Sequence, residues 1–172
     1  MSDVAPEFSR LVSVAQLGLE PFRQRIEATP EERERLAQRL DLLTLDRFAA
    51  DVELRRENAQ VIVLEAAFAA EFEQCCSVTL EPVRGVIADR FALIYGPQEN
   101  QGPEVTLSAD EPAFEPLAGD VIDIGEAVAQ ELSLALPEFP RRADAGIGDL
   151  IEAEPEDGPF ASLARLRKRR AS

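Results

Sequence analysis

Few side chains in this sequence are suited to covalent or metal chemistry, and two of them are neighbours. The 172 residues include two cysteines, Cys75 and Cys76, and no histidine. Adjacent cysteines rarely close a disulfide with each other, because the ring would be strained. Without histidine the chain cannot build a Ser-His or Cys-His nucleophile, and two cysteines cannot fill a four-ligand zinc site. The residue types therefore predict no catalytic residues, no metal site and no cofactor.

Carboxylates are the remaining candidates for chemistry. The 33 acidic residues exceed the 18 basic ones and give a net charge of −15. In so acidic a chain most carboxylates are expected to be solvated surface, and no pair of them stands in a recognisable site context. We therefore predict a protein that binds a partner rather than an enzyme, with no small-molecule substrate. An enzyme with paired carboxylates is the alternative, and a buried cleft holding two acids would support it.

The chain carries no obvious membrane or export signal. It contains no run of about 18 apolar residues, and residues 1–9 lack the basic and then apolar pattern of a signal peptide. A disulfide framework is absent, as in proteins of reducing compartments. We expect a cytoplasmic location and no membrane partner.

The elements that must position any site follow from apolar periodicity. Residues 9–28 read as two strands, and Thr29 starts a helix that is expected to end near Leu43. Residues 46–56 and 61–76 alternate like a hairpin, followed by a strand over 83–95 and a short one over 120–122. A second helix starts after Asp123 and ends at Pro137. The pattern predicts an α+β fold: a curled antiparallel sheet of about five to six strands, which could approach a barrel, packed with two main helices.

Composition divides the chain. Residues 8–140 are predicted to form a single domain in which 97–116 is a flexible acidic loop, and 141–172 to form a mobile acidic linker and a basic tail. Within 61–76 the even-numbered residues share the apolar face, so Cys76 is expected in the core and Cys75 on the wetter side.

Charge is polarised along the sequence. Residues 97–158 contain 16 acids against two basic residues, whereas the tail carries five cations: Arg165, Arg167, Lys168, Arg169 and Arg170. The acidic segment could attract a highly basic protein, and the tail is the one segment with the right sign to contact RNA. The tail could equally be a solubilising terminus that contacts nothing.

Three segments resemble a known family. The first, residues 76–82, has the sequence Cys-Ser-Val-Thr-Leu-Glu-Pro. The second, residues 123–137, starts with Asp-Ile-Gly-Glu and ends with Glu-Leu-Ser-Leu-Ala-Leu-Pro, and the third, residues 158–166, has the sequence Gly-Pro-Phe-Ala-Ser-Leu-Ala-Arg-Leu. They are similar, in this order, to segments of the YceD-like family of large ribosomal RNA subunit accumulation proteins. The positions that match the family pattern are Cys76, Leu80, Glu81, Pro82, Glu131, Pro137, Pro159 and Phe160.

The resemblance implies a function, and at one position this sequence departs from the family pattern. It implies a non-enzymatic factor that supports the accumulation, processing or stability of 23S ribosomal RNA, with ribosomal RNA or a basic ribosomal protein as partner. The alternative is a general acidic module that holds a basic client protein. Thr79 stands where many members have a second cysteine, so any metal or redox role of a cysteine pair does not carry over. The one-cysteine form looks like the alphaproteobacterial branch.

Overall fold

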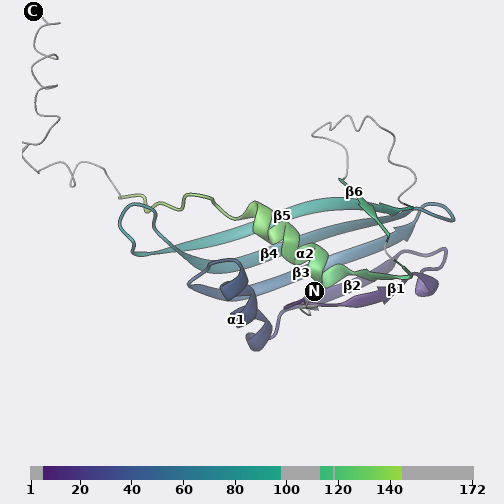
Figure 1. Ribbon diagram of the computed structural model, residues 1–172, viewed down its shortest axis with the longest axis horizontal. Helices are drawn as coiled ribbons and strands as arrows, with labels where there is room; N and C mark the ends of the chain where they lie inside the picture. The colour runs from purple at the N-terminus through teal and green to yellow at the C-terminus, as the bar shows by residue number, and fades with distance from the viewer. Residues whose placement is uncertain (1–5, 98–112, 118, 145–172) are drawn as a thin grey trace, which may run out of the picture.

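A curved five-stranded sheet is the largest element of the described chain (Figure 1). The computed structural model describes residues 6–97, 113–117 and 119–144. In spatial order the strands are β2 (Phe22–Glu27), β3 (Thr44–Arg56), β4 (Ile62–Cys75), β5 (Pro82–Gly96) and β6 (Ala113–Pro116). The neighbours from β2 to β5 are antiparallel, as the short connections after β3 and β4 favour, and β6 pairs parallel to residues 93–96 of β5.

Both helices lie on one face of this sheet (Figure 1). Helix α1 (Pro30–Arg39) packs on β3, and α2 (Ile124–Ala135) crosses β4 and β5. Beside α2, β1 (Leu11–Ser13) pairs with β7 (Val121–Asp123) in a small second sheet, and a single turn of 3-10 helix, η1 (Val14–Gln16), follows β1. No helix in the described residues is long and apolar enough to cross a membrane.

The α+β class predicted from the sequence is confirmed, with two corrections to the sheet. It is mixed rather than wholly antiparallel, because β6 runs parallel to β5. It also stays open rather than approaching a barrel, since β2 and β6 are the two edges of the described sheet. Strand β6 occupies the end of the segment predicted as a flexible loop over 97–116, and residues 98–112 lie outside the described part.

Period-two alternation produces the core, as the sequence indicates. The even-numbered residues of β4 from Ile62 to Phe72 are buried under the helices. A row of aromatic rings crosses this face through Phe8, Phe48, Phe68 and Phe91, with centroids 5.3, 6.5 and 6.2 Å apart. The opposite, outer face carries cross-strand ion pairs such as Arg23–Glu53 at 2.7 Å and Arg55–Glu65 at 3.2 Å.

Helix α1 starts where its sequence predicts and ends earlier. The Thr29 side chain accepts from the Glu32 amide at 3.3 Å, and the Glu32 carboxylate accepts from the Thr29 amide at 2.9 Å, which completes the capping box. The helix ends at Arg39 rather than near Leu43. The reason is Asp41, whose φ of 54° is left-handed and cannot continue a right-handed helix.

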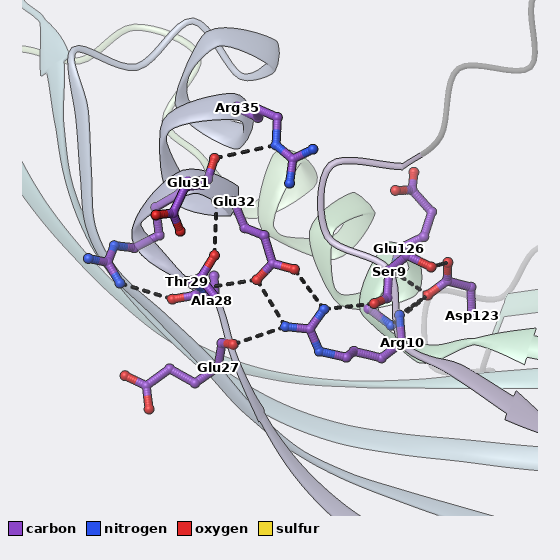
Figure 2. Close-up of polar contacts among 12 residues, drawn as sticks. Ser9, Arg10, Glu27, Ala28, Thr29, Glu31, Glu32, Arg35, Asp123 and Glu126 are labelled. Atoms are coloured by element: carbon purple, nitrogen blue, oxygen red, sulfur yellow. Dashed lines mark hydrogen bonds and ion pairs between the residues drawn. The ribbon is translucent and has the colours of Figure 1, made fainter.

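A polar network fastens the N-terminal segment to the starts of both helices (Figure 2). The Arg10 guanidinium donates to both Glu32 carboxylate oxygens at 2.7 and 2.9 Å, and it lies 4.7 Å from the centre of the Phe8 ring. Asp123 caps α2 by accepting from the amides of Gly125 and Glu126, and it also accepts from the Ser9 hydroxyl at 2.6 Å. This network sets where α2 begins, and therefore where the segment after α2 lies.

Candidate functional site

The loop between β4 and β5, residues 76–81, is closed by its own backbone. The Cys76 amide donates to the Glu81 carbonyl at 2.8 Å, and the Leu80 amide donates to the Cys76 carbonyl at 3.0 Å. Leu80 adopts a left-handed φ of 61°, a conformation that is costly for a residue with a Cβ. The turn is therefore held in one conformation by its hydrogen bonds and by the strands on either side.

The chain that follows α2 packs against this loop. Both the amide and the hydroxyl of Ser77 donate to the Pro140 carbonyl, at 2.9 and 3.0 Å. The Gln74 side-chain amide donates to the Pro137 carbonyl at 3.3 Å, and Arg142 pairs with Glu81. Two segments separated by about sixty residues in sequence thus form one surface, which we call the loop–proline site (residues 74–82 and 136–142).

Cys76 has a structural position in the loop–proline site. Its side chain is buried, and its sulfur accepts from the Thr79 amide at 3.4 Å. Hydrogen bonds from the Thr79 side chain and amide lower the pKa of the Cys76 thiol to about 6, while burial opposes the shift. Thr79, where the family pattern often has a second cysteine, therefore supplies donors to the first. The predicted orientations are confirmed, because Cys76 is buried and Cys75 is exposed.

The loop–proline site has a cavity and, outside the cavity, two exposed apolar side chains. A cavity of about 500 Å³ lies between the end of α1, the loop and the chain after α2, and its lining includes Arg39, Asp41, Gln74, Ser77, Pro137 and Pro140. Leu80 and Phe139, one on each segment, are 76% and 71% exposed. Exposed large apolar side chains on a fixed backbone are typical of surfaces that bind another macromolecule.

The structure gathers some predicted site residues and separates others. Cys76, Leu80, Glu81, Pro82 and Pro137 all belong to the loop–proline site. Glu131 does not, because it lies earlier on α2, where the charges of Asp89 and Glu115 reach it. Pro159, Phe160 and the basic tail residues Arg165, Arg167, Lys168, Arg169 and Arg170 fall outside the described residues.

Sequence reasoning missed three residues of the site: Ser77, Phe139 and Pro140. Ser77 stands inside a family-like segment, but its partner, a backbone carbonyl, has no sequence signal. Phe139 did carry one, since it is a large apolar residue just before the segment 141–172 that is predicted to start as an acidic linker. An aromatic side chain there has no core to enter and therefore points to an exposed contact.

The burial difference between the two cysteines predicts a clear difference in reactivity. In the folded protein, Ellman's reagent should titrate one of the two thiols rapidly, because Cys75 is exposed and Cys76 is buried. Denaturant should release the second thiol. The Cys75→Ser variant is the control, and it should show almost no fast thiol when folded. Two fast thiols in the native protein would contradict this position of Cys76.

The fold and the loop–proline site define an α+β protein whose distinctive described surface is made of prolines, backbone carbonyls and exposed apolar side chains. A family model described as large ribosomal RNA subunit accumulation protein YceD matches residues 64–167, more than half of the chain. The chain belongs to this family, whose name refers to accumulation of a ribosomal RNA and to no reaction. Comparisons with curated proteins and with solved structures found no significant match.

Proposed function

We propose that this protein is a non-enzymatic cytoplasmic factor that supports the accumulation of 23S ribosomal RNA by binding a component of the maturing large subunit. Family membership supports the process, since the matched range runs from β4 through both segments of the loop–proline site. The binding partner in this proposal is ribosomal RNA or a basic ribosomal protein.

One observation carries the proposal: the family-like segment 76–82 contacts the chain that directly follows the family-like segment 123–137, about sixty residues away in sequence. Ser77 and Pro140 join them directly, and Leu80 and Phe139 are exposed beside the join. A surface that is built by long-range contacts and exposes apolar side chains is typical of a site that binds another macromolecule. We infer that the loop–proline site is the docking surface for the ribosomal component.

Depletion of the protein tests the process. Loss of the protein should lower the level of large subunits and of their RNA on a sucrose gradient, while small-subunit RNA changes less. Unchanged large-subunit levels after complete depletion would overturn the proposal.

A pull-down after nuclease treatment distinguishes the two kinds of partner. Ribosomal proteins that are retained without RNA indicate a protein contact. Recovery of unrelated basic proteins alone would favour the general acidic module.

Substitutions at the site test the surface. In depleted cells, the Leu80→Asp and Phe139→Asp double variant should fail to restore large-subunit RNA while remaining folded, because both side chains are exposed. Leu19→Asp is the matched control, since Leu19 is fully exposed and lies in the connection before β2. If the double variant restored large-subunit RNA to the level reached with the control, the loop–proline site would have no part in the proposed function.

The basic tail has its own expected result. If the tail binds RNA, deleting residues 165–170 should weaken binding of a 23S fragment. The slope of log affinity against log salt should also fall, by about one for each phosphate that the tail neutralises. Equal affinity and slope in the truncated protein would show that the tail does not bind the RNA.

A further inference from the structure

One part of the sheet face that packs against α2 is only half covered. Along β5, Phe91 ends the aromatic row and is partly buried, as is Ile87, while Asp89 between them is exposed. Within the described residues, β6 pairs only with residues 93–96 of β5, so the earlier two thirds of β5 has no neighbour on this side. Leu134 on α2 is 77% exposed. The described chain thus leaves an apolar strip open where its core meets the edge.

Three carboxylates border this strip, and none of them has an ion-pair partner among the described residues. They come from three elements: Asp89 on β5, Glu115 on β6 and Glu131 on α2. Partial burial and then the charges of Asp89 and Glu115 raise the pKa of Glu131. On the outer face of the sheet, by contrast, acids face arginines on neighbouring strands, as in Arg25–Asp51 at 3.1 Å and Arg47–Glu71 at 3.7 Å.

An apolar strip bordered by three carboxylates is suited to bind a segment that carries both cations and apolar side chains. No group of three acidic or cysteine side chains in the described ranges is placed to hold a metal ion, so the three carboxylates do not form a metal site. Their separation around an apolar strip instead suits a segment that brings several cations on different side chains together with apolar groups between them. Burying apolar side chains against the core would stabilise the bound segment more than exposed ion pairs alone would.

This chain contains a segment with that composition. Residues 160–170 carry Phe160, Leu163 and Leu166 at three-residue intervals and five cations, one at Arg165 and four over 167–170. Fifteen residues lie between Asp144, the last described position, and Phe160, and an extended chain of that length reaches about 50 Å. A tethered segment also binds at high effective concentration, which favours it over a separate molecule of equal affinity.

We propose that residues 160–170 of this chain dock on the open strip of β5, between α2 and β6, with their cations against Asp89, Glu115 and Glu131. Phe160 and the two leucines cover Ile87, Phe91 and Leu134. In this contact, Phe160 adds one more ring to the aromatic row that ends at Phe91. It does not depend on the function proposed above, because it requires neither RNA nor a ribosomal protein.

The single lysine of the chain provides the test. Lys168 is the only lysine in the sequence, so a zero-length carbodiimide cross-link from its amine to a carboxylate reports where the tail lies. In the full-length protein, mass spectrometry should find Lys168 joined mainly to Asp89, Glu115 and Glu131, within one molecule. Links mainly to acids in 138–157, mainly to outer-face acids such as Glu65, or between two molecules would each overturn the proposal.

Two variants separate docking from general attraction of opposite charges. Replacing Phe160, Leu163 and Leu166 by serine leaves every charge in place and should lower the three cross-links at least threefold. Glu131→Gln should likewise lower the links to Asp89 and Glu115, whereas Glu71→Gln, on the outer face, should change neither. Cross-link yields unaffected by the serine variant would show that charge alone brings the tail near, and the docked segment would be abandoned.

Discussion

Replacing Arg10 by alanine is expected to lower the free energy of unfolding by about 2–3 kcal/mol, measured by urea denaturation. The Arg10 guanidinium donates to both carboxylate oxygens of Glu32 and to the Ser9 carbonyl at 2.7 Å (Figure 2). The Glu32 side chain is only 13% exposed, so removing Arg10 leaves a poorly hydrated carboxylate without its main partner.

The matched control for Arg10→Ala is Arg23→Ala. Arg23 also pairs with a glutamate at 2.7 Å, but its side chain is 74% exposed. An exposed pair of this kind contributes less than about 1 kcal/mol. Equal losses in the two variants would mean that burial does not decide the strength of the Arg10–Glu32 pair.

The same pair gives a pH dependence with a definite sign. The hydrogen bond from Arg10 lowers the pKa of Glu32 below its usual 4.5. The stability that this pair adds is therefore present above pH 4.5 and is lost as pH falls through the lowered pKa. The unfolding free energies of wild type and Arg10→Ala should converge in that acid range. A difference that stays constant down to pH 2 would contradict the ionic part of the contact.

Gly125→Ala is expected to destabilise the protein by about 2–3 kcal/mol, although alanine is the better helix former by about 1 kcal/mol. A Cβ on Gly125 would lie 2.6 Å from the Phe8 carbonyl oxygen and 2.9 Å from the Arg10 amide nitrogen. Both atoms belong to the backbone of the segment that crosses the start of α2, so neither can rotate away. The measured midpoint of thermal unfolding should fall by several degrees.

Gly18→Ala is the control for this substitution. A Cβ at Gly18 meets no atom within 4 Å, and the expected change in stability is within about 0.5 kcal/mol. If Gly125→Ala instead stabilised the protein, as its helix propensity alone predicts, the close crossing of the N-terminal segment over α2 would be wrong.

The long elements and the starts of both helices could be predicted from the sequence because local chemistry fixes them. Alternation in β4 identified its buried face, and with it the inward position of Cys76 and the outward position of Cys75. Thr29 and Asp123 marked both helix starts, since each cap is a hydrogen bond to an amide two or three residues away. The end of α1 escaped prediction, because a left-handed residue such as Asp41 is not visible in an apolar pattern.

By itself, then, the sequence determined the α+β class, the caps, the polarised charge and the resemblance that the family match confirms. Only the tertiary structure decided that β6 pairs parallel to β5, that Ser77 meets Pro140 and that Glu131 lies apart from the other family positions in the described residues. The physical reason is the distance along the sequence over which each kind of interaction acts. Periodicity and capping act within a few residues, whereas contacts such as Ser77–Pro140 involve backbone groups that every residue carries and that only the packed chain brings together.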